Sequence, residues 1–518
     1  MAARVFRSER GLEEVVNLAQ TLRASALAVP SRPAIIVDDV VDCSYSQFAD
    51  RVAARAGDLV SHSGVQPGDR VGLFMTNRPD YLEALYAIWW AGAVAVPLNS
   101  MMHPREAIAL LDDCKARVCL VSPDLAEGML SEAPNPSVIR VIDQKELLDA
   151  RKAETIGCST ATTSDDAWIF YTSGTTGKPK GAQLTHSNLF AMAVAYLADT
   201  EWVDDRSGLL HIALQSHASG LFALPFVARG AAQVVPTSTD PTAIAQLLTV
   251  HDRLSFFAPP LLMRRLAVSP QIQAAPLERM GTLLVGAAPV YAEDLRLALG
   301  TFGPRIWNGY GQGETPCTIT AMGQRQMAAA AAAGDDVLLS SVGVPRVGIE
   351  VKIMQDDVEV SDGDVGEVCV RGETVMRGYL DRPEETAESL RGGWLHTGDL
   401  GRWERGHLQL LDRSKDMVIS GGSNIYPREI EDLLLQEPTV AEVAVIGLPD
   451  PEWGERVVAI IVTEPGCSLD AERLDAFCLE SMARYKRPKE YLQVDSLPRN
   501  GAGKVLKREL REQLQAKE

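Results

Sequence analysis

Apolar residues in the first two thirds of the chain alternate between short runs of strand length and longer runs with helical spacing. DRVGLFMTN at 69–77, PDYLEALYAIWWAGA at 79–93 and VAVPLN at 94–99 predict a strand, a helix and a second strand. Further strands are predicted by ARVCLVS, LSFFAPP and GTLLVGAAP, which stand between helical stretches. The pattern favours an α/β fold with layered, partly parallel sheets.

The pattern changes near residue 340. SSVGVPRVGIEVKIM, GEVCVRG and HLQLLD are short strand-like runs separated by glycine-containing turns, which predict a β-rich subdomain. After residue 413 the remaining hundred or so residues predict a small, mobile C-terminal α+β domain. Its predicted elements are helices at 427–436 and 470–484 and strands near 440–447 and 456–463. We therefore expect a large N-terminal domain at 1–413 and a small domain at 414–518, and a peripheral helix at the alanine run 328–333.

The stretch YTSGTTGKPKG at 171–181 joins two ordered segments. An apolar run precedes it, and THSNLFAMAVAYLAD after it has capping residues ahead of a helical pattern. Its glycines, hydroxyls and two lysines provide the close backbone approach, donors and positive charge that a phosphate chain requires. It is not a P-loop, because Pro179 follows Gly177 and Lys178 where that motif needs serine or threonine.

Composition narrows the function classes. The chain has 518 residues, 46% hydrophobic and 23% charged, as in globular proteins. The net charge of −19 argues against nucleic acid as a partner, and no segment predicts a transmembrane helix or a secretory signal. The eight cysteines form no CxxC pair, which favours a reducing compartment, so we expect a cytoplasmic protein. A homodimer is possible.

Five motifs together resemble the AMP-forming adenylate enzymes, the superfamily of acyl-CoA synthetases, peptide-synthetase adenylation domains and luciferases. They occur in that family's order and are YTSGTTGKPKG at 171–181, NGYGQGET at 308–315, GGWLHTGDLG at 392–401, LDRSKDMVISGGSNIYP at 411–427 and PRNGAGKVLKREL at 498–510. The resemblance implies a carboxylate–CoA ligase that uses ATP, Mg²⁺ and coenzyme A. The acid attacks the α-phosphorus of ATP and releases pyrophosphate, and a thiol then takes the acyl group from AMP. Such transfers depend mainly on positioning of the reactants and on stabilisation of the charge that develops.

The resemblance also implies roles for single residues. Tyr310 would stack on adenine, Asp399 would bind the ribose hydroxyls, Arg413 would add a donor to ribose or phosphate, and Glu314, with Thr172, would bind Mg²⁺. The phosphate-binding residues would be Thr172, Ser173, Gly174, Thr175, Thr176, Gly177 and Lys180. The other residues assigned to the cofactor site are Gly286, Ala287, Ala288, Asn308, Gly309, Gly311 and Gln312.

The second motif departs from the family pattern Y-G-x-T-E, because Gly313 replaces a threonine whose hydroxyl would contact the α-phosphate. Gln312, a backbone N–H or a water supplies that donor instead, or adenylation is slower.

Lys504 is expected to be catalytic, because its ammonium group would stabilise the transition state of the first half-reaction. The basic residues that follow it, Lys507, Arg508 and Arg511, are expected to be solvated. Lys415 matches the family's hinge, about which the small domain would rotate. Gly421 and Gly422 would then let the pantetheine arm of coenzyme A pass close to the backbone.

The acyl pocket is expected at the segments from His217 to Phe222, from Phe257 to Pro260 and from Gly286 to Pro289. His217 is interpreted as a gate or a carboxylate neighbour, and a purely structural histidine is as probable. The segments carry no Asp for an amino group, which favours an aromatic or fatty monocarboxylate. The alternatives are an enzyme that loads a carrier protein and a nucleotide-binding regulator without turnover.

Overall fold

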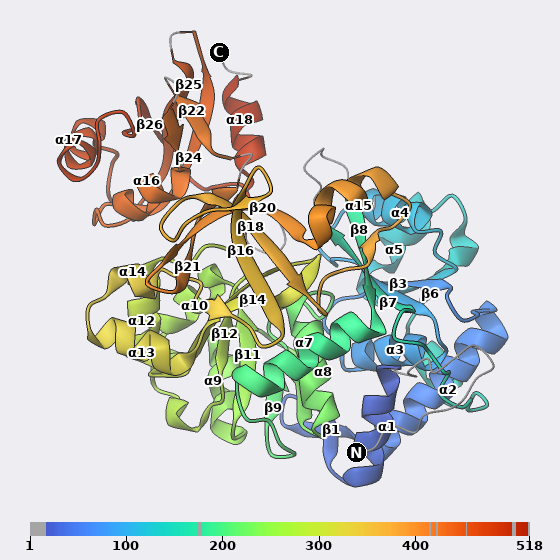
Figure 1. Ribbon diagram of the computed structural model, residues 1–518. Helices are drawn as coiled ribbons and strands as arrows, with labels where there is room; N and C mark the ends of the chain where they lie inside the picture. Colours follow the sequence, from blue (N-terminus) through green and yellow to red (C-terminus); the bar gives the residue numbers. More distant parts are fainter. Residues whose placement is uncertain are drawn as a thin grey trace.

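The computed structural model describes residues 17–172, 179–413, 416–420, 423–451, 453–499 and 504–515, apart from the side chains of Gln144, Arg413, Ser423 and Asn424. Residues 17–413, which we call the body, contain three sheets (Figure 1). Residues 416–515, which we call the cap, contain a fourth sheet. The mixed α/β class, with a β-rich part and a separate C-terminal unit, is confirmed. The domain boundary stays a prediction, because residues 414 and 415 lie outside the described residues.

The first sheet has seven strands in the order β19-β8-β7-β4-β3-β5-β6. Its centre is parallel, since β3 pairs in parallel with both β4 and β5. The predicted strand, helix and strand at 69–99 are β3, α3 and β4. The strands are β3 Arg70–Phe74, β4 Val94–Pro97, β5 Val118–Val121, β6 Ile139–Val141, β7 Asp166–Thr172, β8 Lys180–Thr185 and β19 Gly378–Tyr379.

The second sheet has nine strands in the order β15-β14-β13-β12-β11-β9-β10-β1-β2. Strands β11, β12 and β13 run in parallel, so that Phe257, Leu284 and Trp307 lie side by side in the register. The strands are β1 Pro33–Val37, β2 Val40–Ser44, β9 Gly208–Leu210, β10 Ala232–Val235, β11 Leu254–Ala258, β12 Leu283–Val285, β13 Ile306–Gln312, β14 Thr315–Met322 and β15 Val344–Pro345.

The third sheet is antiparallel and confirms the predicted β-rich subdomain, in the order β17-β16-β18-β20-β21. Its strands are β16 Ile349–Gln355, β17 Val358–Glu359, β18 Gly366–Gly372, β20 Leu395–Glu404 and β21 His407–Arg413. It lies between the two larger sheets of the body and the cap (Figure 1).

Helices cover the two large sheets and separate them (Figure 1). The peripheral helix expected at the alanine run is α13, which buries Met327 and Ala330. The helices of the body are α1 Ala19–Ala28, α2 Tyr45–Ser63, α3 Pro79–Trp90, α4 Pro104–Asp113, α5 Pro123–Glu132, α6 Gln144–Ala150, α7 His186–Asp199, α8 Ala218–Ala228, α9 Pro241–Val250, α10 Pro260–Ala267, α11 Pro270–Gln273, α12 Ala292–Phe302, α13 Gln324–Ala332, α14 Asp336–Leu339 and α15 Pro383–Ser389. Among the described residues, no helix is both long enough and apolar enough to cross a membrane.

The cap has its own hydrophobic core, built on the long antiparallel pair β24 and β25. Helix α17 ends at Ser481, three residues before the predicted end at 484, because the chain is extended at Met482. The elements of the cap are β22 Val418–Ser420, β23 Ser423–Ile425, α16 Pro427–Leu434, β24 Val440–Asp450, β25 Gly454–Thr463, α17 Ala471–Ser481, β26 Glu490–Gln493 and α18 Lys507–Gln515.

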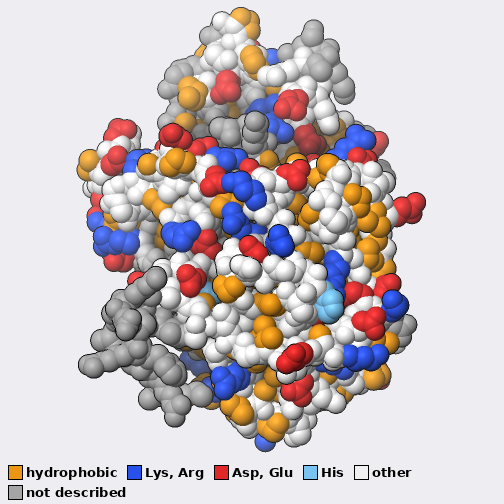
Figure 2. Space-filling view, turned by 90° about the vertical axis from the view of Figure 1, so that its right-hand side faces the viewer, with side chains coloured by type: hydrophobic (Ala, Val, Ile, Leu, Met, Phe, Trp, Pro, Cys, Tyr) orange, Lys and Arg blue, Asp and Glu red, His pale blue; other side chains and the backbone are white. Residues whose placement is uncertain are grey.

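Acidic and basic side chains are interspersed over the face of the body that Figure 2 shows. That face therefore carries no continuous basic surface of the kind that binds nucleic acid.

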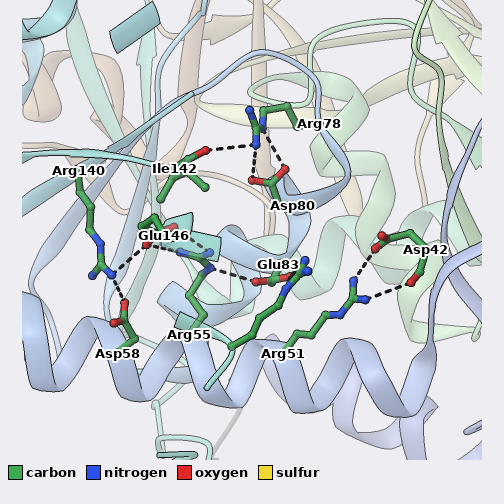
Figure 3. A network of polar contacts seen from close by, with 11 residues as sticks. Asp42, Arg51, Arg55, Asp58, Arg78, Asp80, Glu83, Arg140, Ile142 and Glu146 are labelled. Atoms are coloured by element: carbon green, nitrogen blue, oxygen red, sulfur yellow. Dashed lines mark hydrogen bonds and ion pairs between the residues drawn. The ribbon is translucent and has the colours of Figure 1, made fainter. Parts of the chain in front are cut away.

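A buried network of charges joins α2, α3 and α6 in the body (Figure 3). Arg55, whose side chain is 1% exposed, lies between Glu83 at 3.1 Å and Glu146 at 3.1 Å. Arg151 contacts the other oxygen of Glu83 at 2.7 Å, and Arg140 contacts Glu146 at 2.9 Å. Each buried charge depends on its partners, because an unpaired charge in such a place is costly.

Replacing Glu83 with glutamine keeps the side chain's shape but removes the charge shared by Arg55 and Arg151. We expect Glu83→Gln to lower the free energy of unfolding by roughly 3 kcal/mol, measured by urea denaturation. The matched control is Glu132→Gln, which removes a surface partner of Arg105 and should leave the urea midpoint unchanged. Equal effects of the two substitutions would contradict the importance of the buried network.

Candidate active site

A cavity of about 480 Å³ lies between the body and the cap. The body contributes to it the ends of neighbouring strands of the second sheet and Asp399 of β20. The residues from the body include Pro259, Pro260, Ala287, Ala288, Pro289, Asn308, Gly309, Tyr310, Gly311, Gln312 and Asp399, and those from the cap include Glu442, Val443, Arg499, Lys504, Val505 and Lys507. Most of the described residues predicted for the nucleotide site thus meet at one cavity.

The position of this cavity follows from the second sheet. Strands β11, β12 and β13 are parallel, so their carboxyl ends meet at one edge of the sheet. Ligands of open α/β sheets bind at this edge, outside the carboxyl ends of the strands.

Tyr310 and Gln312 both reach Asp399 across the rim of the cavity. The Tyr310 hydroxyl donates to Asp399 Oδ2 at 2.6 Å, and Gln312 Nε2 donates to the same oxygen at 2.6 Å. Gln312 Nε2 also donates to the Thr397 carbonyl at 2.9 Å. The amide nitrogen of Gln312 is therefore occupied by Asp399 and Thr397.

Glu314 lies between β13 and β14 and is 8% exposed. Its Oε1 accepts hydrogen bonds from the Thr172 hydroxyl at 2.9 Å and from the Tyr379 hydroxyl at 2.9 Å. Lys180 places its ammonium group 5.2 Å from the centre of the Tyr379 ring. Thr172 and Tyr379, whose hydroxyls contact the Glu314 carboxylate, are both uncharged donors. A buried carboxylate held only by neutral donors has the chemistry of a cation ligand.

His217 precedes α8 and lies against Phe170, with ring centres 5.4 Å apart and the rings edge to face. Its Nδ1 is 2.8 Å from the Ser216 hydroxyl. Loss of solvation lowers the pKa of His217 to about 4, so the imidazole is neutral at pH 7. His217 is not among the residues that line the cavity, so its expected place beside the acyl group stays a prediction.

Gly313 is required by the packing around it. A Cβ atom at this position would lie 2.5 Å from Cγ2 of Thr172 and 2.7 Å from Cδ1 of Phe170. The space that the family's threonine would use is thus filled by two residues of β7. A side chain at position 313 would therefore meet both Thr172 and Phe170.

Lys504 lines the cavity from the cap, as the motif predicts. The expectation for Lys507 is wrong: its ammonium group lies 2.8 Å from Glu431 and 3.7 Å from Asp412 in a buried cluster. Burial alone would lower the pKa of Lys507, but these carboxylates outweigh it and raise the pKa. Arg511 is also paired, with Asp416 at 2.9 Å, and only Arg508 is exposed as expected.

Some predicted residues cannot be located. Ser173, Gly174, Thr175, Thr176, Gly177, Lys415, Gly421 and Gly422 lie outside the described residues, as does the side chain of Arg413. Gly286 does not line the cavity, but a Cβ there would lie 2.7 Å from the Gly309 carbonyl oxygen, so these two strand ends approach closely.

Two residues of the site carried no signal in the sequence. Tyr379 belongs to a two-residue strand, far from Glu314 in the chain, and nothing in the periodicity connects them. Phe170 is one of several apolar residues in β7, so the sequence does not single it out. Its contact with the position of Gly313 becomes visible only in the structure.

Two family models match the chain. The AMP-binding enzyme model matches residues 22–380, and the model of the AMP-binding enzyme C-terminal domain matches residues 429–504. The chain therefore belongs to the AMP-binding enzyme family.

Relatives in the family differ in the acids they are named for. A feruloyl-CoA synthase of Amycolatopsis sp is 37% identical over 90% of this chain and 93% of its own length. A medium/long-chain-fatty-acid–CoA ligase, FadD8 of Mycobacterium tuberculosis, is 30% identical over 93% of this chain and 87% of its own. The crystal structure of ATP-bound MatB from Rhodopseudomonas palustris is 29% identical with a TM-score of 0.87, and covers 96% of this chain and 99% of that chain. The apo structure of MatB gives a TM-score of 0.76 at the same coverage.

The packing at Gly313 predicts a specific double-mutant result. Gly313→Thr should lower the free energy of unfolding by roughly 1–3 kcal/mol through overpacking, measured by urea denaturation. Adding Phe170→Ala removes the ring that the new side chain meets, so the double variant should be more stable than the sum of the single effects predicts.

Gly300→Thr is the matched control, because Gly300 lies in α12 with open space where a Cβ would stand. It should show no coupling with Phe170→Ala. If the changes in the free energy of unfolding caused by Gly313→Thr and Phe170→Ala are additive, the side chains at positions 313 and 170 do not compete for the same space.

Proposed function

We propose that the protein is an AMP-forming carboxylate–CoA ligase. In the first half-reaction, a carboxylate oxygen attacks the α-phosphorus of ATP, and the bond to pyrophosphate breaks. In the second, the thiolate of coenzyme A attacks the acyl carbon and AMP leaves. The observation that carries this proposal is that Tyr310, Asp399 and Lys504, from three separate motifs, line one cavity.

The residues divide the work of the first half-reaction. Tyr310 and Asp399 hold the nucleoside, and their mutual hydrogen bond orients both before ATP arrives. Lys504 enters from the cap, where its ammonium group would offset the negative charge that gathers between the carboxylate and the α-phosphate. Positioning and charge stabilisation are what such a transfer needs, so no side-chain nucleophile is required. We assign the pyrophosphate to the loop that contains Ser173, Thr175 and Thr176, with Lys180.

Glu314 fits a role in holding Mg²⁺. Its carboxylate is buried, it accepts from the neutral hydroxyls of Thr172 and Tyr379, and its Oε2 accepts no hydrogen bond from the described residues. A hard cation on that carboxylate would neutralise phosphate charge as pyrophosphate leaves. Thr172 and Tyr379 would then keep the Glu314 side chain in one orientation.

The second half-reaction requires Lys504 to leave the site. We propose a division at 413 and 414, with a rotation of the cap about Lys415 that withdraws Lys504 and brings Gly421 and Gly422 to a passage for the thiol. The chain superposes better on ATP-bound MatB than on apo MatB, so its overall arrangement is nearer to that of the ATP-bound structure.

The acid is proposed to be an aromatic or aliphatic monocarboxylate. The walls near α8 and β11 carry Phe222 and Phe257, and no ionised partner for a substrate amino group is present among those two segments. The relatives named for ferulate and for medium- and long-chain fatty acids belong to this class of acid.

A pyrophosphate-release screen tests the function. The purified chain, ATP and Mg²⁺ are combined with acetate, butyrate, hexanoate, palmitate, benzoate and cinnamate, with and without coenzyme A. We expect acid-dependent release, and acyl-CoA with AMP when coenzyme A is added. If acyl-AMP accumulates and is discharged only by a phosphopantetheinylated carrier protein, the thiol is misassigned. If ATP binds but no acid stimulates release, the protein is a regulator.

Lys504→Ala separates the two half-reactions. We expect acyl-AMP formation to fall roughly a hundredfold or more, as for other groups that stabilise transition-state charge. Thioester formation from supplied acyl-AMP and coenzyme A should be retained, as measured by chromatography of acyl-CoA. Arg508→Ala, on the exposed side of α18, is the control and should leave both halves unchanged. Equal loss of both halves in Lys504→Ala would refute the assigned role.

A further inference from the structure

The indole of Trp307 covers Gly309. A Cβ at Gly309 would lie 2.2 Å from Cη2 and 2.3 Å from Cζ3 of Trp307. The six-membered ring therefore packs directly on the backbone of Gly309, and Trp307 itself is 2% exposed. The space that a glycine opens beside the cavity is thus filled from the same strand, two residues earlier.

Trp307 belongs to a continuous apolar layer. Phe257, Leu284 and Trp307 lie side by side on β11, β12 and β13, and Phe222 of α8 packs against this row. The Phe222 ring centre is 6.5 Å from that of Trp307 and 5.8 Å from that of Phe257. Each of the four side chains is at most 7% exposed. We call the apolar layer of these four buried side chains the floor.

The floor lies just beyond the cavity. Asn308, Gly309 and Tyr310 line the cavity, whereas Phe222, Phe257 and Trp307 do not. Because successive residues of a strand point to opposite faces, Trp307 and Gly309 share the face toward α8. An acyl group that runs from the reacting carboxylate past Gly286 and Gly309 toward α8 therefore meets the indole.

The indole is held in this place by a second interaction. The guanidinium carbon of Arg346 lies 4.9 Å from the centre of the Trp307 ring, and Arg346 is itself paired with Asp199. A buried cation on the ring resists its displacement. Among the described residues the indole N–H has no hydrogen-bond partner. Phenylalanine would fill a purely structural position without that cost, so the larger outline of tryptophan is the relevant property.

We propose that Trp307 sets the length limit of the acyl site, and that the acid is a short aliphatic or single-ring carboxylate. This inference rests on the proposed function and narrows its substrate class. Long-chain acids are excluded because the rigid floor closes the path that their chains would take. Trp307 is a residue that determines specificity and takes no part in the bond-making steps.

Binding of unreactive acyl-AMP mimics tests this limit without turnover. The probes are acyl-sulfamoyl adenosines with acetyl, butyryl, hexanoyl, octanoyl, lauroyl, palmitoyl and benzoyl groups, titrated by calorimetry. We expect the unaltered chain to bind the acetyl, butyryl, hexanoyl and benzoyl mimics tightly. We expect its affinity to fall for the octanoyl mimic and for the longer ones. Trp307→Ala should raise the affinity for octanoyl and lauroyl roughly tenfold or more, the scale of one or two methylene contacts.

Trp307→Phe keeps the core filled and should move the limit by a smaller step, which gives a result even if Trp307→Ala folds poorly. In both variants we expect kcat/KM for long acids to rise. For acetate we expect kcat/KM to fall, mainly through a higher KM. Trp90→Phe is the matched control, because Trp90 is also buried but lies on α3, and it should leave the limit unchanged.

The inference is overturned if the unaltered chain binds the palmitoyl mimic as tightly as the butyryl mimic, or if neither Trp307 variant moves the limit. Failure of the proposed function gives a different result. In that case the mimics bind with the expected length limit, but no acid releases pyrophosphate.

Discussion

The close approach of two strand ends is the constraint on which the site depends. A Cβ at Gly286 would lie 2.7 Å from the carbonyl oxygen of Gly309, so β12 and β13 can run side by side only with glycine there. Phe257, Leu284 and Trp307 lie side by side two residues earlier in the register. Alternation along β13 then directs Tyr310 and Gln312 toward Asp399 and Trp307 toward α8. One strand thereby contributes Tyr310 and Gln312 to the cavity and Trp307 to the apolar layer against α8.

Polar contacts tie this strand to the other two sheets of the body. Asp399 on β20 accepts hydrogen bonds from Tyr310 and Gln312, and Glu314 accepts from Thr172 and Tyr379 of the first sheet. The groups that would hold nucleotide and metal are therefore oriented before any ligand binds. Such preorganisation lowers the entropy cost of assembling the transition state.

The sequence predicts the parts of this structure that depend on local pattern. Strand and helix periodicity indicates β3, α3, β4 and α7, and glycine-separated runs indicate the third sheet. Tyr310, Asp399 and Lys504 belong to three separate motifs, and the fold brings the three motifs to one cavity. Contacts between distant segments are not encoded in local pattern. Lys507 was expected in solvent, but Glu431 and Asp412 come to it only when the cap folds over the end of β21.

Gly313 is a second example of a contact that local sequence does not predict. The sequence shows only that position 313 carries no hydroxyl, whereas the structure shows that Phe170 and Thr172 occupy the space beside its Cα. Phe170 also lies edge to face against His217, so the ring that crowds Gly313 packs on this histidine as well.

Polar contacts join cap and body. Arg428 donates to the Val290 carbonyl at 3.2 Å, and Arg264 lies 3.7 Å from Glu464. Lys507 of the cap also lies 3.7 Å from Asp412 of the body in a buried cluster. A turn of the cap has to return these groups to water, at a cost that is largest for the buried pair. The cores of cap and body are separate clusters, and each stays intact if the cap turns. Because Tyr310 and Asp399 both belong to the body, a turn of the cap leaves their hydrogen bond in place.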